Sequence, residues 1–408
     1  MTRRPIIGAG AVAVAIAVVI ATALVLALSP ARPPTTVDAS RSPDGSASQG
    51  PTARPTVRPV PGHEVFGFVP YWEMDGGIAA HLAATDLSTL ALFSVTHRRN
   101  GSINTSQTGF ERITGDIGAQ LIREAHVRGV DVQLVFTSFG TTKNERFFGS
   151  ITAQDATIEA LVALAADIGV DGINVDGERL SADLVPAFGT FIGRLRDALR
   201  VVIPKGRVSA ATGAGRTGAA MAAAASIAGA DRIFLMGYDY HYGKSQVGAS
   251  APISRRDGSR QDLVWSLDMY EALGVPLEKT ILGLPLYGLR WRVEGPEIGS
   301  PRLGDGAIWV PADNPNFLGS PPLPPELDPI EVVEFYAVAP TVSPKPGDSR
   351  ATAGWQAIYV DSPRTLAPKL ALADERGLAG AGFWAIGYER GLPDYSELIA
   401  RFRAGKLE

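Results

Sequence analysis

Hydrophobic and polar positions alternate in the segment DGINVDGE near the middle of the chain. In a β-strand, Ile173 and Val175 would point to one side, whereas Asn174, Asp176 and Glu178 would point to the other. A parallel sheet that is buried on both faces does not tolerate such a polar row. The pattern fits one wall of a (β/α)8 barrel, in which the apolar residues meet the outer helices and the polar residues line the interior.

The same kind of patterning extends from about His63 to the end of the chain. Helical stretches rich in Ala and Leu, for example 153–168 and 184–202, separate short strand-like runs. A repeated β-then-α order predicts a closed parallel barrel rather than a doubly wound sheet. The expected strands are 65–71, 90–95, 131–138, 172–178, 207–211, 232–238, 280–286 and 382–387.

An unusually long segment, about 292–360, separates the seventh and eighth expected strands. It contains possible strands near 331–337 and 355–360 and a proline-rich portion with Pro321, Pro322, Pro324 and Pro325. A connection of this length usually has its own structure or function. We expect a small α+β insertion that forms one wall of a cleft; the alternative is an irregular decorated loop.

The N-terminal hydropathy pattern predicts a membrane anchor. An uncharged apolar run from about Pro5 to Leu28 follows Arg3 and Arg4. It exceeds the apolar core of about 7–15 residues in a signal peptide and is long enough to span a bilayer. We expect residues 1–29 to be a cytoplasmic stub and an uncleaved signal-anchor helix in the cell membrane, with the remainder outside. The alternative is a cleaved signal peptide and a secreted protein.

Residues 30–62 consist mainly of Pro, Ser, Thr, Ala and Arg. Such a segment cannot bury enough apolar surface to offset its ordering entropy, so it should form a disordered linker. We therefore expect residues 63–408 to form the barrel domain, held away from the membrane by this tether.

Composition excludes several kinds of site. The formal net charge of -4, without a long basic run, gives no reason to expect a nucleic-acid partner. The chain has no cysteine, which excludes disulfides and thiolate metal sites, and its five histidines lack metal-ligand spacing. We expect no metal and no cofactor, and no obligate protein partner is evident.

Glu178 is the last residue of its predicted strand, at the C-terminal mouth where such barrels hold their catalytic groups. A carboxyl group that acts as an acid near neutral pH needs a raised pKa. Asp176 lies on the same face two residues earlier, and its like charge would supply part of that shift. The sequence therefore predicts a carboxylate-based active site.

The strand resembles the D-x-x-D-x-D-x-E signature of glycoside hydrolase family 18, a chitinase-like family, with Asp171, Asn174, Asp176 and Glu178 at the four positions. Further segments resemble the family in the expected order. These are FGFVPYW at 66–72, the M-x-Y-D motif at 236–239, GLPLYGLRW at 283–291 and GFWAIGY at 382–388.

The chain departs from that pattern at two positions. Asn174 replaces the usual first inward Asp, and Gly177 replaces a position that is often bulky. With Asn at this place, the chain looks most like the branch of spore-cortex and peptidoglycan N-acetylglucosaminidases. Because Asn cannot take the proton that Asp would share with its neighbour, we expect an altered pH dependence rather than a loss of activity.

The resemblance implies a role for each residue of the site. The 2-acetamido group of the substrate would be the nucleophile, oriented by Asp176, with Glu178 as general acid and base. Tyr238 would bind the acetamido carbonyl, Asp239 would support the sugar, and Trp384 would form an apolar floor. Further candidate substrate-binding residues are Asn174, Met236, Tyr71, Trp72, Tyr287 and Trp291.

The resemblance implies a glycosidase acting on glycans that contain β-1,4-linked N-acetylglucosamine. Peptidoglycan-like material is the first expectation, because a tethered enzyme acts on what lies near the membrane, and chitin is the second. The alternative is a catalytically silent glycan-binding, chitolectin-like protein on the same barrel. A third reading is a structural envelope protein that does not depend on Glu178.

Overall fold

The structure is a computed structural model that describes residues 62–314, 324–339 and 354–407. The predicted anchor, most of the predicted linker, and Pro321 and Pro322 of the predicted insertion lie outside the described residues. Within the described residues, no helix combines the length and the apolar character that a membrane crossing requires.

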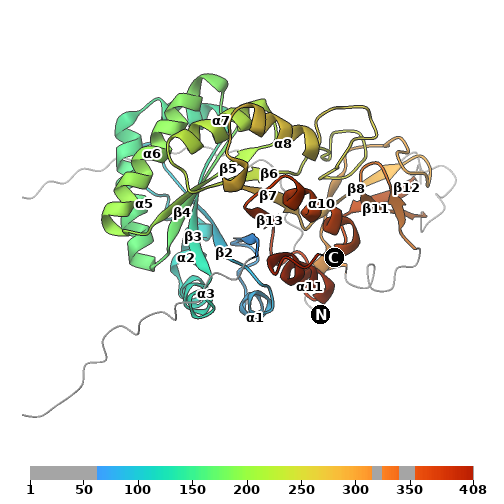
Figure 1. The fold of residues 1–408 in the computed structure, drawn as a ribbon, viewed down its shortest axis with the longest axis horizontal. Helices are drawn as coiled ribbons and strands as arrows, with labels where there is room; N and C mark the ends of the chain where they lie inside the picture. Colours follow the sequence, from blue (N-terminus) through green and yellow to red (C-terminus); the bar gives the residue numbers. More distant parts are fainter. Residues whose placement is uncertain (1–61, 315–323, 340–353, 408) are drawn as a thin grey trace, which may run out of the picture. The chain divides into compact units, whose positions relative to one another are not determined.

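Eight parallel strands close into a barrel in the order β1-β13-β7-β6-β5-β4-β3-β2 (Figure 1). The prediction of a (β/α)8 barrel is therefore confirmed. Each predicted strand overlaps an observed one, and the boundaries differ by a few residues. The barrel strands are β1 (Glu64–Pro70), β2 (Thr89–Thr96), β3 (Asp131–Phe139), β4 (Gly172–Glu178), β5 (Arg207–Gly213), β6 (Arg232–Met236), β7 (Thr280–Pro285) and β13 (Gly380–Trp384).

Helices follow the strands along the chain, and Figure 1 shows α5, α6 and α7 on the outside of the barrel. Local signals set their ends: the Ser150 hydroxyl caps the start of α5, and Gly169, with a φ of 74°, ends it. The described helices are α1 (Ile78–Ala83), α2 (Thr108–Thr114), α3 (Asp116–Val127), α4 (Thr141–Phe148), α5 (Ile151–Ile168), α6 (Val185–Val202), α7 (Arg216–Ile227), α8 (Leu263–Ala272), α10 (Pro363–Glu375) and α11 (Pro393–Arg403).

Two apolar layers hold the barrel together. Ile173 and Val175 of β4 belong to the large cluster that includes Phe188 of α6, so this side of the strand faces the helices as expected. A separate aromatic-rich cluster fills the barrel interior, with Phe68 and Phe234 packed edge to face at 4.8 Å. The interior is therefore a packed floor, and a cavity can form only above it, at the mouth.

The insertion is an antiparallel five-stranded sheet in the order β10-β11-β12-β8-β9. Its strands are β8 (Gly288–Val293), β9 (Ala307–Trp309), β10 (Glu326–Asp328), β11 (Val333–Val338) and β12 (Trp355–Val360). The expectation of an α+β unit is thus wrong for the described part, which contains one short 3₁₀ turn, Pro311–Asp313, between its strands.

The insertion also starts earlier than the predicted residue 292. Leu289, Trp291 and Val293 of β8 are buried, whereas Arg290 and Arg292 are exposed. This alternation is typical of an antiparallel strand with one solvated face. The alternation is visible in the sequence, but none of the strands expected from the sequence covers residues 288–293.

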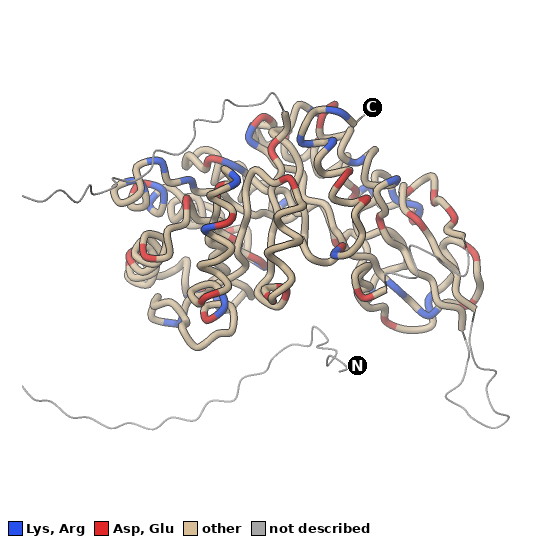
Figure 2. Tube along the Cα trace, turned by 90° about the horizontal axis from the view of Figure 1, so that it is seen from below, with Lys and Arg blue, Asp and Glu red and all other residues tan. Residues whose placement is uncertain are grey.

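Charged residues of both signs are interspersed over the helices and loops (Figure 2). Several arginines lie against carboxylates; Arg390, for example, is 2.8 Å from Asp75. Exposed pairs of this kind contribute about 0–1 kcal/mol each. The pair between Lys369 of α10 and Asp361 differs, because both side chains are almost fully buried and their charged atoms are 2.5 Å apart.

Replacing Lys369 with Met should lower the free energy of unfolding by about 3–5 kcal/mol, because Asp361 would stay buried without its counter-ion. Denaturant unfolding followed by tryptophan fluorescence measures this loss. The double variant Lys369→Met/Asp361→Asn should recover part of the stability. Equal losses in the single and double variants would contradict an uncompensated buried charge.

Candidate active site

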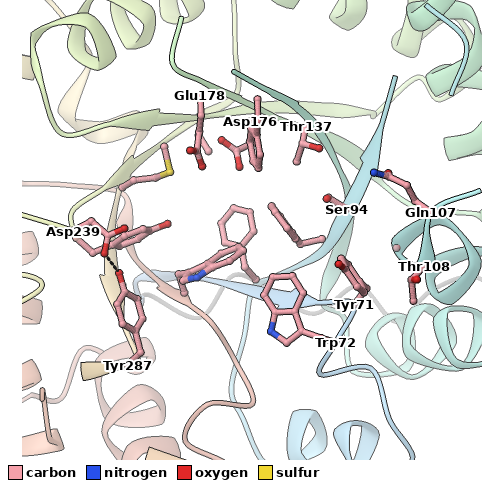
Figure 3. Close-up of a pocket in the computed structure, with 18 of the residues that line it drawn as sticks. Tyr71, Trp72, Ser94, Gln107, Thr108, Thr137, Asp176, Glu178, Asp239 and Tyr287 are labelled. Carbon is pink, nitrogen blue, oxygen red and sulfur yellow. Dashed lines mark hydrogen bonds between the residues drawn. The ribbon is translucent and has the colours of Figure 1, made fainter. Parts of the chain in front are cut away.

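A cavity of about 660 Å³ opens at the C-terminal mouth of the barrel. It is lined by strand ends, by the loops that follow them, and by Ile308 of β9 from the insertion. Figure 3 shows Asp176 and Glu178 side by side on one wall, with Tyr71 and Trp72 facing them across the cavity. The insertion therefore contributes to the wall of the cleft, as the sequence predicted.

The two carboxylates reach the cavity because of the alternation along β4. Asp176 is only 4% exposed, and Glu178 at the strand end is partly exposed. Gly177 lies between them on the opposite face: a Cβ added there would meet Phe188 of α6 at 3.4 Å. A side chain at position 177 would therefore face the helices and not the cavity.

Burial raises the pKa of both carboxyl groups. The pKa of Asp176 lies well above its usual range because the group is out of water, and the charge of Glu178 adds to the shift. The pKa of Glu178 is raised first by burial and then by Asp239, while Arg179 opposes the shift. From the sequence, we expected the like charge of Asp176 to raise the pKa of Glu178. In the structure, burial is the larger cause, and the neighbouring charge that raises this pKa is that of Asp239.

Asn174 lies below the cavity and does not line it, contrary to the expectation that it contacts the substrate. Asn174 is fully buried, and its amide nitrogen donates to the Ser209 hydroxyl oxygen at 2.7 Å. The Ser209 hydroxyl in turn donates to the Gln133 side-chain oxygen at 2.6 Å. The Asn174 Oδ1 and the Asp176 Oδ1 have no hydrogen-bond partner within the described residues. Because a protonated carboxyl is a donor, Asp176 could direct its proton to the Asn174 oxygen.

Asp239 and Tyr238, which follow β6, occupy the side of the cavity next to Tyr287. The Tyr287 hydroxyl donates to Asp239 at 2.5 Å, as Figure 3 shows, and the Ser250 hydroxyl donates to the Tyr287 oxygen at 3.1 Å. Burial raises the pKa of Asp239, and these hydroxyl contacts oppose the shift. Burial and the charge of Asp176 raise the pKa of Tyr238 well above its usual range, so its phenol remains a proton donor.

Aromatic rings form the floor and one wall of the cavity. Trp384, at the end of β13, packs edge to face against Phe93 with centroids 4.7 Å apart. Trp72 is 46% exposed, and its indole nitrogen donates to the Tyr388 hydroxyl at 3.2 Å. A ring that is held in place and open to the cavity offers a stacking face for the apolar side of a sugar.

Comparison with known proteins identifies the family. Residues 67–389, well over half of the chain, match the family described as Glycosyl hydrolases family 18. The chain belongs to glycosyl hydrolases family 18. The resemblance found in the sequence motifs is therefore confirmed.

Individual relatives are more distant. The Nod factor hydrolase protein 1 of Medicago truncatula is 29% identical over 166 residues, which cover 39% of each chain. The chain spans well under half of the length of the curated relatives it matches.

Solved structures of the family share the fold. The spore cortex-lytic enzyme SleL of Bacillus cereus is 17% identical with a TM-score of 0.63, over 83% of this chain and 74% of that one. A family 18 chitinase from Cycas revoluta, solved in complex with (GlcNAc)3, is 17% identical with a TM-score of 0.68, over 85% of this chain and 100% of that one. At this level of identity, the likeness shows a common fold.

The structure brings most of the predicted residues to one cavity. Asp176, Glu178, Met236, Tyr238, Asp239, Trp384, Tyr71, Trp72 and Tyr287 all line it. Trp291 does not: it is buried in the core of the insertion, edge to face with Tyr359 at 5.9 Å. The expectation that Trp291 offers a stacking surface is therefore wrong, because its strand turns away from the mouth to join the insertion sheet.

Several lining residues were not predicted from the sequence. The wall around Tyr71 is completed by Thr137 and Phe139 of β3, by Ser94 of β2, and by Gln107 and Thr108 at the start of α2. The inward alternation of β3 could have identified Thr137 and Phe139. The loop residues carry no comparable signal, because their approach depends on how the chain between β2 and α2 folds back over the barrel.

Among the described residues, no cluster of His, Asp and Glu could hold a metal ion. His241, next to the M-x-Y-D motif, is fully buried, and its Nε2 lies 3.1 Å from Glu331. The contact joins the loop after β6 to the insertion.

Replacing Asp239 with Asn should lower the pKa of Glu178, because the variant removes a negative charge that disfavours ionised Glu178. Glu178 would then lose its proton at a lower pH than in the unmodified chain. NMR titration of ¹³C-labelled glutamate carboxyls, assigned with Glu178→Gln, measures the shift. The control is Asp374→Asn, which removes a carboxylate of α10 that pairs with His63, and it should leave the Glu178 titration unchanged. An unmoved Glu178 titration in Asp239→Asn would contradict the assigned cause.

Proposed function

We propose that this family 18 chain hydrolyses a β-1,4 bond at an N-acetylglucosamine residue, with retention of configuration and with the substrate's acetamido group as nucleophile. The observation that carries the proposal is the pair Asp176 and Glu178, which lie side by side in one cavity above an aromatic floor (Figure 3). Family 18 is among the recognised exceptions to the scheme in which a second protein carboxylate is the nucleophile.

In the first step, Glu178 gives its proton to the glycosidic oxygen as the bond to the anomeric carbon breaks. The acetamido carbonyl oxygen attacks that carbon and forms an oxazolinium-like intermediate. Tyr238, whose phenol remains protonated, donates to the acetamido oxygen and holds it near the carbon. The raised pKa of Glu178 suits this role, because a general acid must carry its proton near the working pH.

Asp176 couples substrate binding to the position of the proton. In the free site its buried carboxyl holds a proton, because its Oδ1 has no donor within the described residues and Glu178 lies beside it. A bound acetamido N–H would supply a donor to Asp176 and stabilise its anion, so that the proton passes from Asp176 to the neighbouring Glu178 carboxylate. Binding would therefore bring the site into its reactive protonation state.

In the second step, water attacks the anomeric carbon from the side that the leaving group vacated. The Glu178 carboxylate takes a proton from this water, and the acetamido group is released. Two inversions at one carbon give net retention, and Glu178 regains its proton for the next cycle.

The lining of the cavity favours an uncharged sugar at the bond that is cleaved. Its described residues include three carboxylates, Asp176, Glu178 and Asp239, and no Lys or Arg. N-acetylglucosamine meets this requirement in chitooligosaccharides and in the alternating strand of peptidoglycan. The relatives, a Nod factor hydrolase, a spore cortex-lytic enzyme and a chitinase, support this class.

We also propose an extracytoplasmic position for the barrel. The proposal rests on the uncharged apolar run between Pro5 and Leu28, preceded by Arg3 and Arg4. A catalytic domain tethered in this way would meet envelope glycan before released chitin, which keeps peptidoglycan-like material as the first substrate to test.

Replacing Glu178 with Gln should lower the rate of glycan cleavage by roughly 10²–10⁴-fold, because Gln cannot donate the proton. The full-length chain and the variant would be incubated with chitooligosaccharides and with purified peptidoglycan, and the products read by mass spectrometry. Proton NMR of early products should show the β-anomer. Glu375→Gln, exposed at the end of α10, is the matched control and should retain activity.

Three results would contradict the proposal. Cleavage that survives in Glu178→Gln would remove the carboxyl from the mechanism. Glycan binding without cleavage by the unmodified chain would favour the glycan-binding alternative. Neither binding nor cleavage would leave the structural envelope role.

Replacing Asn174 with Asp should move the alkaline limb of the pH–rate profile to higher pH. The added negative charge of a carboxylate at this buried position would raise the pKa of both Asp176 and Glu178, because like charge disfavours their ionised forms. Glu178 would then keep its proton at higher pH. The profile of kcat/KM against pH tests this, and an unchanged profile would show that Asn174 does not influence the proton shared by the pair.

A further inference from the structure

The main-chain carbonyl of Glu178 is held by two donors from outside its own strand. The Gly140 N–H donates to it at 3.1 Å, and the side-chain amide of Asn144 donates at 2.6 Å. Asn144 is fully buried in α4, close to the start of that helix. Because helical side chains lean toward the helix N-terminus, Asn144 reaches back to the end of the neighbouring barrel strands.

Asn144 is the first of three buried residues that are linked in series by hydrogen bonds. Its Oδ1 accepts from the Ser138 hydroxyl at 2.7 Å, and the Ser138 oxygen lies 2.9 Å from the His97 Nε2. The direction of these bonds follows from the carbonyl at one end. A carbonyl can only accept, so Asn144 must present its NH₂ group to Glu178, and its Oδ1 then takes the single Ser138 proton. The Ser138 oxygen then faces the His97 Nε2 with a lone pair.

His97 anchors the far end of this series. Its ring lies against Phe147 of α4 with centroids 4.1 Å apart. Burial, with the nearby Lys143 ammonium, lowers the pKa of His97 to about 4, so the ring is neutral at ordinary pH. Its Nδ1 faces the Arg98 carbonyl at 3.0 Å, so the single proton of the neutral ring can donate to only one of the two acceptors, Arg98 or Ser138. The Glu178 carbonyl therefore determines the orientation of the Asn144 amide and of the Ser138 hydroxyl. It does not determine which ring nitrogen of His97 carries the proton.

None of these three side chains lines the cavity. Ser138 points away from it, whereas Thr137 and Phe139 on either side line it. The series therefore cannot touch a substrate in the cavity and can act only through the main chain of Glu178.

The backbone around Glu178 needs such support. Gly177 precedes it and leaves the chain unusually free, and Arg179 follows it in the left-handed region with a φ of 59°. Non-glycine residues rarely adopt this conformation unless surrounding contacts determine it. A displacement of about 1 Å at a catalytic group can cost roughly 100-fold in rate.

We propose that Asn144, oriented by Ser138 and His97, is a positioning residue that fixes the main chain of Glu178 and thereby aims its carboxyl group into the cavity. The effect on catalysis rests on the proposed function. The effect on the backbone does not, because it concerns the end of β4 alone.

The test compares Asn144→Leu with Gln154→Met in the full-length chain. Both variants replace a buried amide with an apolar side chain of similar size. Gln154 also donates to main-chain carbonyls, those of Phe147 and Phe148 at 3.4 and 3.0 Å, but at the other end of α4. It therefore controls for the loss of a buried hydrogen bond beside the same helix.

Asn144→Leu should speed hydrogen–deuterium exchange in peptides that cover 172–181, read by mass spectrometry, whereas Gln154→Met should not. On the chitooligosaccharide that the unmodified chain cleaves, Asn144→Leu should lower kcat by roughly 10- to 100-fold and change KM by less than about threefold. Ser138→Ala, which leaves Asn144 in place, should change both measurements in the same direction but less. It is the variant to use if Asn144→Leu does not fold.

Unchanged exchange across 172–181 in a folded Asn144→Leu or Ser138→Ala chain would overturn the proposal. So would a loss of kcat no larger than that of Gln154→Met at equal thermal stability. An unmodified chain that cleaves no glycan would overturn the proposed function instead, and the exchange measurement would still decide whether Asn144 fixes the backbone.

Discussion

The removal of two carboxyl groups from water is the constraint on which the rest of this site depends. Asp176 and Glu178 stand on the inward face of one strand, above a floor of packed aromatic rings. Ionisation in such a place is unfavourable, because little water remains to solvate the charge. Both groups therefore hold protons more firmly than exposed carboxyls do, and an acid usable near neutral pH follows from burial rather than from an added cofactor.

The surroundings of the pair adjust this basic effect in opposite directions. Asp239 adds negative charge, and Arg179 opposes it. Tyr287 in turn holds Asp239, so a residue that follows β7 influences a group at the end of β4 without touching it. Below the pair, Asn174 offers an unpartnered oxygen where the usual family pattern has a third carboxyl. An amide oxygen can accept a hydrogen bond there but cannot take a proton.

Rigid support is the second requirement, because a correctly ionised acid is effective only when it points at the bond. The β-strands supply most of this support. At Glu178 the strand ends, a glycine precedes the residue and a left-handed residue follows it. At this point Asn144 of α4, which accepts from Ser138 of β3, donates to the main-chain carbonyl of Glu178 and not to its carboxyl group. The carboxyl therefore remains available for chemistry while its backbone is held.

The sequence by itself determined the barrel, the strand that carries Asp176 and Glu178, and the family. These features depend on local periods: a two-residue alternation sorts side chains between the two faces of a strand, and helical stretches between strands require parallel neighbours. The same reasoning placed Tyr238, Asp239 and Trp384 at strand ends, where the structure finds them lining the cavity.

Only the tertiary structure decided which residues meet across the chain. Trp291 belongs to a strand of the insertion because β8 pairs with β12. This pairing places Leu289 opposite Tyr359, 70 residues later, and it carries the Trp291 ring into another core. Asn144 and Ser138 reach Glu178 only because α4 packs back against the ends of β3 and β4. Contacts of this kind depend on how distant segments pack, and no local period in the sequence records that packing.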